Sequence, residues 1–159
     1  MFGAQHQTNW RTKSSKHSKK SELRKEYLTK PGQRVGVDQM ISAQPGLIPQ
    51  EKGNLTRERI WACTVFVDYY TIYVFVALLR DLTADSRLAT KKEFEHHCSV
   101  RGVKVKHYHA DNGRFDEPEW INECKRCKQD LKFCGVGAHH QNGISERKIK
   151  DVTIISRTL

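Results

Sequence analysis

Three acidic residues that lie far apart in the sequence have the chemistry and the settings of metal ligands. Asp111 follows a β-like run in the segment HYHADNGRF, Asp38 lies on an earlier run in RVGVDQM, and Glu146 lies in the first turn of a predicted helix. Carboxylates on two strands and a later helix can hold two Mg²⁺ ions, which act on the attacking and leaving oxygens of a phosphodiester. Asp38, Asp111 and Glu146 are therefore candidate metal ligands and catalytic residues. From the residues alone two alternatives stay open: Asp68 also stands at the end of a strong strand, and Glu146 could be an ordinary surface residue of an amphipathic helix.

The charge of the chain indicates an anionic partner. Its 159 residues contain 28 Lys and Arg against 18 Asp and Glu, which gives a net charge of +10, with a pI near 9.5. Nucleic acid is the first candidate for a protein of this charge, and a merely solvated basic surface is the alternative. The length suits one domain with an additional arm.

The arm is residues 1–30, and the domain is residues 31–159. The arm has few apolar residues and cannot form a core. Two acids, Glu22 and Glu26, oppose its eight basic residues, which are Arg11, Lys13, Lys16, Lys19, Lys20, Arg24, Lys25 and Lys30. Two interpretations remain open: a basic arm that contacts phosphates, and a solvated, partly disordered tail.

The cysteines and the N-terminus favour an intracellular protein, in the nucleus or the cytoplasm. The five cysteines are an odd number, and the N-terminal residues are polar, without the apolar core of a signal peptide. We therefore expect reduced thiols.

Residues 61–79 form the longest apolar stretch, yet they do not predict a membrane helix. Asp68 interrupts the stretch, which is rich in β-branched and aromatic residues and has a turn-like break at residues 68–70. Two antiparallel strands, 61–68 and 72–79, explain this composition better, and no membrane partner is expected.

Further elements are predicted on either side of this hairpin. Alternation of Val35 and Val37 with smaller or polar residues predicts a strand over 32–42, and a loop rich in Pro and Gly follows it. A helix over 82–100 could be capped by Asp81, Thr83 or Asp85. Gly102 then closes this helix before a strand over 103–110. The alternation of strands and helices predicts a mixed α/β sheet.

A helix is also predicted over 116–133, where Trp120, Cys124, Cys127 and Leu131 form one apolar stripe. The Cys124-x-x-Cys127 pair raises the hypothesis of a zinc site completed by His139 and His140 or by Cys134. Cysteines on a buried stripe are explained more simply as small core residues, because no second pair with zinc-knuckle spacing is evident.

The last predicted helix begins at Gly143, with Asn142 as its N-cap. Glu146, Lys150, Thr153 and Arg157 share one face of it, and an adjoining apolar face holds Ile149, Val152, Ser156 and Leu159. The acid and two cations therefore face one way, and the neighbouring face is expected to pack on the sheet.

These motifs resemble the catalytic core of copia-type LTR-retrotransposon integrases, which are retroviral-like, from Gly32 to the C-terminus. The segments that carry the resemblance are VDQM, TVFVDYYT, HYHADNGRF and FCGVGAHHQNGISERKI. The resemblance implies an RNase H-like α/β fold, a mixed five-stranded sheet flanked by helices, with the chain incomplete at the C-terminus. It assigns the catalytic triad to Asp38, Asp111 and Glu146, and it makes Asp68 a structural residue that caps the hairpin.

The implied activity is that of a DNA integrase, a polynucleotidyl transferase and endonuclease dependent on two Mg²⁺ or Mn²⁺ ions. It would trim the 3′ ends of retrotransposon DNA and join them to target DNA, as a homo-oligomer. Expected DNA contacts are Asn112, Gln141, Asn142, Lys148 and Lys150, and His109 is interpreted as a hydrogen-bonding residue outside the catalytic set.

Two other hypotheses belong to different classes of protein. The first is a catalytically silent integrase remnant that only binds DNA or partner subunits. The second is a small zinc-binding interaction module built on the cysteines.

Overall fold

The computed structural model describes residues 28–46, 59–111, 113–134 and 143–158, so most of the basic arm lies outside the described residues. The described elements, in chain order, are β1 (Val35–Gly46), β2 (Ile60–Asp68), β3 (Val74–Leu79), α1 (Ala84–Ser99), β4 (His107–Ala110), α2 (Pro118–Arg126), β5 (Asp130–Phe133) and α3 (Gly143–Thr158).

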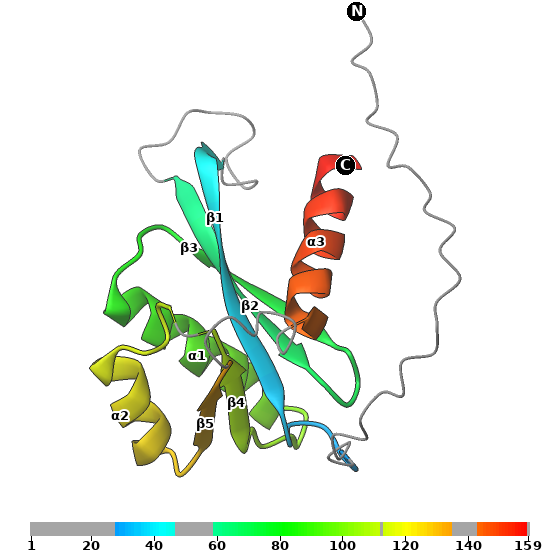
Figure 1. Cartoon of the computed structure of the whole chain (residues 1–159), viewed down its shortest axis with the longest axis vertical. Coiled ribbons are helices and arrows are strands. Elements are labelled where there is room, and N and C mark those ends of the chain that lie inside the picture. Colours follow the sequence, from blue (N-terminus) through cyan, green and yellow to red (C-terminus); the bar gives the residue numbers. More distant parts are fainter. Residues whose placement is uncertain (1–27, 47–58, 112, 135–142, 159) are drawn as a thin grey trace, which may run out of the picture.

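The five strands form one mixed sheet in the order β3-β2-β1-β4-β5 (Figure 1). The pairs β1–β2 and β2–β3 are antiparallel, whereas β1–β4 and β4–β5 are parallel. The prediction of a mixed five-stranded sheet is confirmed. Its central strand, β1, is the one that carries Asp38.

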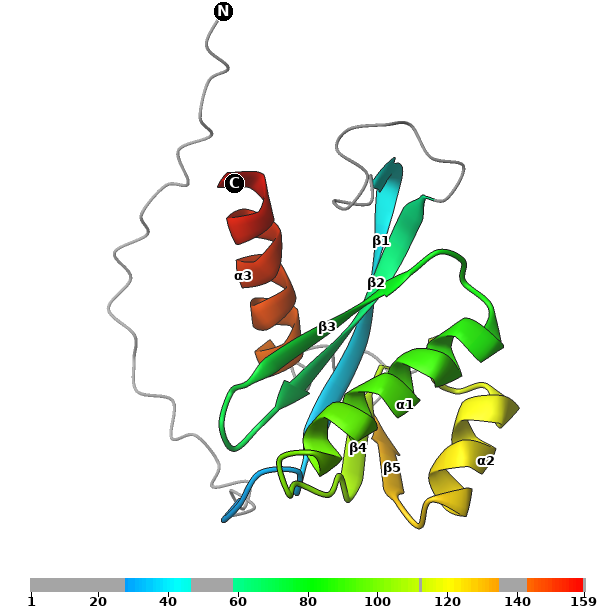
Figure 2. The same cartoon turned by 180° about the vertical axis from the view of Figure 1, so that it is seen from behind.

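Helices α1 and α2 cover one face of the sheet (Figure 2). Val35 and Val37 point from β1 into this core, together with Phe66 of β2. Phe66 stacks on Phe94 of α1, with ring centroids 4.5 Å apart, and Trp120 of α2 is also fully buried here. The alternation seen in the sequence therefore marks the side chains that face α1 and α2.

Helix α3 covers the opposite face, over β1 and β2. Ile149 of α3 packs with Met40 against a cluster formed by Cys63, Val65 and Val67. Thr153, predicted on the face of Glu146, instead reaches the sheet, because its hydroxyl lies 3.3 Å from the sulfur of Met40 and donates to the carbonyl of Ile149. The packing face of α3 is therefore wider than its apolar residues indicate.

The apolar stretch 61–79 forms β2 and β3, as predicted, with the turn between them after Asp68. Among the residues that the structure describes, no helix combines the length and the apolar character needed to cross a bilayer.

The helix predicted over 116–133 is wrong beyond Arg126. Lys128 adopts a positive φ of 53°, which ends the helix, and the amide of Asp130 donates to the carbonyl of Lys106 to begin β5. Leu131 and Phe133 then alternate with exposed residues, as on a strand. The prediction failed because Leu131 would reach the core from a helix or from a strand. Its helical spacing from Cys127 therefore could not distinguish the two kinds of element.

Local signals at the ends of α1 were more reliable. Of the three candidate caps, Thr83 is the N-cap, accepting a hydrogen bond from the amide of Ser86. Gly102 has a φ of +71°, a conformation that glycine adopts readily, and it terminates the segment after α1 as expected. Strand β4 begins at His107, later than predicted.

Candidate active site

Asp38 lies on β1, and Asp111 directly follows the neighbouring parallel strand β4 at the same level. The register pairs Gly36 with His109 and Val37 with Ala110, so the next positions along the two strands are Asp38 and Asp111. Adjacent strands are about 4.8 Å apart. Two carboxylates separated by 73 positions in the sequence are thus neighbours across the centre of the sheet.

Glu146 is brought to the same region by the first turn of α3. Ser145, the preceding residue, is fully buried above Gly36, on the face of β1 that also carries Asp38. Glu146 itself is exposed. The structure therefore places the three acids in one region of the molecule, near enough for the charges of Asp111 and Glu146 to act on Asp38.

The electrostatics of Asp38 reflect this arrangement. Burial raises the pKa of the Asp38 carboxyl, a hydrogen bond from the amide of Gln39 opposes that rise, and the charges of Asp111 and Glu146 raise the pKa further. The pKa of the nearby Cys134 thiol is raised by burial and by the same three carboxylates. The charges of Asp111 and Glu146 thus act on the Asp38 carboxyl and disfavour its ionised form.

The three carboxylates fit Mg²⁺ in donor type, because magnesium prefers oxygen ligands and binds through carboxylates. A cation between them would relieve the repulsion that raises the pKa of Asp38. Within the described residues, however, no group of three or more His, Cys, Asp or Glu side chains is gathered closely enough to hold an ion. The acids are coupled through their charges without converging on one point.

The predicted DNA-binding residues divide into two groups. Asn112, Gln141 and Asn142 lie outside the described residues. Lys148 forms a 3.2 Å ion pair with Asp151, whereas Lys150 is exposed one helical turn after Glu146. Lys150 is therefore the more available cation near the acids.

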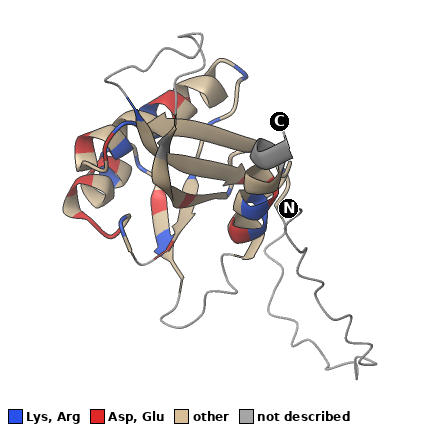
Figure 3. Ribbon diagram, turned by 90° about the horizontal axis from the view of Figure 1, so that it is seen from above, with Lys and Arg blue, Asp and Glu red and all other residues tan. Residues whose placement is uncertain are grey.

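Charge on the described part of the chain is mixed. Figure 3 shows Lys and Arg alternating with Asp and Glu along the helices, while the strands are mostly uncharged. The arm, residues 1–30, contains eight basic residues and two acids, which is +6 of the net charge of +10. More than half of the net positive charge that indicated nucleic acid thus belongs to the arm.

Four residues beside the acids were not predicted as part of the site. The hydroxyl of Tyr69 lies 3.2 Å from Nδ1 of His109 and 3.4 Å from Oγ of Ser145, and Sγ of Cys134 lies 3.7 Å from Nε2 of His109. His109 forms hydrogen bonds, as the sequence indicated. One signal for this cluster was available: Gly36 interrupts a strand, where glycine often marks a close approach.

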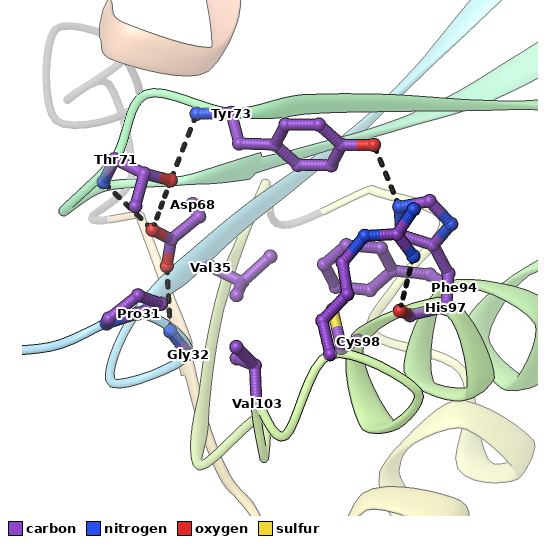
Figure 4. Close-up of a pocket in the computed structure, with 11 residues that line it drawn as sticks. Pro31, Gly32, Val35, Asp68, Thr71, Tyr73, Phe94, His97, Cys98 and Val103 are labelled. Carbon is purple, nitrogen blue, oxygen red and sulfur yellow. Dashed lines mark hydrogen bonds between the residues drawn. The ribbon is translucent and has the colours of Figure 1, made fainter.

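Asp68 has the structural role predicted for it. Its two carboxylate oxygens accept hydrogen bonds from the amide of Gly32 at 2.9 Å, the amide of Thr71 at 2.8 Å and the hydroxyl of Thr71 at 2.6 Å (Figure 4). These bonds fix the β2–β3 turn and tie it to the chain entering β1. Asp68 points toward the α1 face, away from the candidate site.

On that α1 face lies a cavity with a volume of about 270 Å³. Figure 4 shows the residues that line it. Its walls are mainly apolar and include Val35, Phe94 and Val103. On its rim the hydroxyl of Tyr73 bonds to Nε2 of His97 at 2.8 Å. This cavity and the three acids lie on opposite faces of the sheet.

The cysteines are free thiols, and Cys124 is buried in the main core, as the simpler interpretation of the apolar stripe predicted. Cys127 is half-buried, with Sγ 3.8 Å from a carboxylate oxygen of Glu123. His139 and His140, the other members of the hypothetical zinc site, lie outside the described residues.

The five-stranded mixed sheet with its three helices is the RNase H-like fold of retroviral integrase catalytic cores. Particular solved structures that the chain resembles are the HTLV-2 integrase catalytic core domain in complex with magnesium, in dimeric form (19% identity, TM-score 0.50), and the BIV integrase catalytic core domain (18% identity, TM-score 0.53). Each comparison covers 76% of this chain and 66% of the other.

A larger assembly shows the same likeness. The intasome of simian T-cell lymphotropic virus in complex with PP2A regulatory subunit B56 gamma matches with a TM-score of 0.59 and 14% identity, over 76% of this chain and 38% of that chain. No protein-family profile and no curated protein matches the sequence. At these identities the likeness establishes the fold.

Proposed function

We propose that this chain is the catalytic core of a copia-type retrotransposon integrase, a polynucleotidyl transferase that trims the 3′ ends of element DNA and joins them to target DNA. The observation that supports this most directly is the coupling of Asp38 to Asp111 and Glu146, which three separate elements bring to one face of the sheet. The fold shared with retroviral integrase cores adds to it.

In this proposal Asp38, Asp111 and Glu146 hold two Mg²⁺ or Mn²⁺ ions. When bound, such ions would activate a water or a 3′-hydroxyl for attack and stabilise the charge that develops on the phosphodiester. One of the similar structures, the HTLV-2 core, is a complex with magnesium. The protein's own contribution is to hold three anionic groups together in a partly buried setting, where they favour a cation over solvent.

DNA is the proposed substrate, and the chain offers cations beside the acids to bind it. Lys150 follows Glu146 by one turn of α3 and is exposed, so it can contact a phosphate next to the reacting one. Asn112, Gln141, Asn142 and Lys148 are the further proposed contacts. The basic arm would add affinity that does not depend on DNA sequence.

The proposal includes assembly of several copies and an intracellular location in the nucleus or cytoplasm. The HTLV-2 core is a dimeric form, and the simian virus structure is an intasome. The proposed partners of this chain are accordingly element DNA, target DNA and further copies of itself.

The proposal is tested by incubating the chain with branched DNA that mimics an integration intermediate, with Mg²⁺ or Mn²⁺. We expect metal-dependent nicking or rejoining that is lost in Asp111→Asn. The matched control is Asp116→Asn, because Asp116 is an exposed acid on the same connection and is not one of the three acids. Equal activity of Asp111→Asn and wild type would contradict the assignment.

Other outcomes point to the other hypotheses. DNA binding without turnover, at any metal concentration, would indicate a catalytically silent remnant. One zinc per chain, lost in Cys124→Ser, would indicate a zinc-binding module. Binding to DNA that does not weaken with added salt would remove nucleic acid as a charge-recognised partner.

A further inference from the structure

The residues that surround the hydroxyl of Tyr69 each lie beside one of the three acids. Ser145 directly precedes Glu146 on α3, and His109 of β4 lies two positions before Asp111, which follows that strand. Gly36, which the Tyr69 ring crosses, lies two positions before Asp38 on β1. One side chain thus contacts all three segments that carry the acids.

The position of Tyr69 is determined by the sheet. Its backbone amide donates to the carbonyl of Arg34 at 3.0 Å, just before β1 begins. Its ring packs against the cluster of Cys63, Val65 and Val67 and meets the ring of His109 edge-on, with centroids 6.2 Å apart. Contacts with β1, β2 and β4 therefore hold the ring in place independently of the hydrogen bonds of its hydroxyl.

The approach of α3 to β1 depends on a missing side chain. A Cβ atom added to Gly36 would stand 2.6 Å from Cε1 and 2.7 Å from the hydroxyl of Tyr69, and would collide with Oγ of Ser145. Because Gly36 has no Cβ, the Tyr69 ring and the first turn of α3 can both rest on the strand next to Asp38.

The hydroxyl of Tyr69 has the capacity to join these segments. A phenol can donate one hydrogen bond and accept another, and Nδ1 of His109 and Oγ of Ser145 are both within reach of this one. Ser145 is fully buried, so its hydroxyl has little access to water as a substitute. The bond therefore restrains Ser145, the residue that directly precedes Glu146. Because consecutive Cα atoms are only about 3.8 Å apart, restraining Ser145 also restrains the backbone of Glu146.

We infer that Tyr69 is a positioning residue: its hydroxyl holds the first turn of α3, and with it Glu146, in place against the strands that carry Asp38 and Asp111. It would act on metal binding through Ser145 and His109, the two residues to which its hydroxyl is joined. This inference rests on the proposed function for its catalytic meaning, whereas its structural part stands independently.

Tyr69→Phe tests the inference, because it removes only the hydroxyl and keeps the ring. Tyr73→Phe is the matched control: it also removes a phenol from the same hairpin, but that phenol bonds His97 on the opposite face. Both variants are made in the full chain. The measurements are amide hydrogen exchange of residues 147–149 in α3, the Mn²⁺ concentration for half-maximal binding, and the melting temperature.

We expect Tyr69→Phe to accelerate exchange in the first turns of α3 roughly three- to tenfold, as for loss of one hydrogen bond. The Mn²⁺ concentration for half-maximal binding should rise about tenfold, as for other residues that orient metal ligands. Tyr73→Phe should leave both quantities at wild-type values. Ser145→Ala, which removes the other end of the bond, should reproduce Tyr69→Phe, and the double variant should add little.

If the α3 amides of Tyr69→Phe exchange at the same rate as those of the wild type, the inference is overturned. Faster exchange throughout the sheet with a lowered melting temperature would also overturn it, because Tyr69 would then be an ordinary packing residue. If the wild-type chain neither binds Mn²⁺ nor cleaves DNA, the proposed function fails, while the exchange comparison between the two Phe variants still decides whether Tyr69 positions α3.

Discussion

Ser145 lies directly over Gly36, so that the first turn of α3 rests on the central strand two positions from Asp38. The two residues are 109 positions apart in the sequence. Their contact determines where the helix that carries Glu146 meets the sheet that carries the two aspartates.

Gly36→Ala should therefore disturb the candidate site. The added methyl would meet Tyr69 and Ser145 closer than van der Waals contact allows, so either α3 or the Tyr69 ring must move. Overpacking of this kind costs about 1–3 kcal/mol, and each kcal/mol lowers the melting temperature of a chain this size by roughly 2–4 °C. Thermal denaturation measures the loss, and Mn²⁺ binding measures the displacement of Glu146.

Gly46→Ala is the control for that experiment. Gly46 lies on the same strand, and an added Cβ would stand 3.6 Å from the carbonyl oxygen of Ile60, an ordinary contact. We expect a change within about 0.5 kcal/mol. Equal melting temperatures for the two alanine variants would show that the approach at Gly36 is not tight.

Asp38→Asn should stabilise the metal-free protein at neutral pH. Because burial and the two neighbouring acids raise the pKa of Asp38 in the folded state, the folded chain holds this proton more tightly than the unfolded chain. Stability of the wild type should consequently fall as pH rises from the unfolded pKa of Asp through the higher folded value. The amide cannot ionise, so the variant should lose this part of the pH dependence, as measured by melting temperature between pH 4 and 8 in EDTA.

Added Mg²⁺ should reverse the order of the two melting temperatures, so that the wild type melts above Asp38→Asn. A cation bound by the carboxylates would stabilise the wild type and have little effect on Asp38→Asn. Asp68→Asn offers the opposite control, since its carboxylate accepts three hydrogen bonds at the hairpin, and it should melt lower than wild type with or without Mg²⁺. A destabilised Asp38→Asn in EDTA would argue against repulsion among the three acids.

Lys150→Ala should weaken DNA binding more than Lys148→Ala. Lys150 is exposed, whereas the ammonium of Lys148 is already paired with Asp151. Removing one phosphate contact should reduce the slope of log affinity against log salt concentration by about 1. Binding isotherms for a short duplex at several salt concentrations measure the slope, and equal slopes for the two variants would show that neither lysine is a selective phosphate contact.

Glu95→Ala should strongly destabilise the fold without involving the candidate site. One carboxylate oxygen of Glu95 accepts hydrogen bonds from Lys91 at 2.7 Å, Tyr108 at 2.9 Å and Gln129 at 2.6 Å, which joins α1 to β4 and the start of β5. The Lys91 side chain is fully buried, so removing its partner leaves an uncompensated charge, at a cost of about 3–5 kcal/mol.

Glu93→Ala on the exposed side of the same helix is the matched control for Glu95→Ala. It should change the free energy of unfolding by less than about 0.5 kcal/mol. Urea denaturation of the two variants gives both values, and similar midpoints would contradict a central role for the Glu95 bonds.

The strands and helices could largely be predicted from the sequence, because they depend on local patterns. Val35 and Val37 alternate along β1, the apolar stretch 61–79 divides at Asp68, and Thr83 and Gly102 mark the ends of the segment that contains α1. The exception is β5, where Leu131 would be buried by a helix or a strand alike. The pairing of β5 with β4 decided between them.

From the sequence, Asp38, Asp111 and Glu146 could be named as candidates for a metal site, and the elements that carry them could be predicted. Only the tertiary structure decided that β1 and β4 pair in the register that aligns the two aspartates, and that Tyr69, His109 and Ser145 meet beside them. The physical reason is that backbone propensity and side-chain periodicity act over a few residues, whereas strand register and helix docking depend on which distant surfaces fit. The absence of a Cβ atom at Gly36 matters for the candidate site because α3 packs directly on this residue.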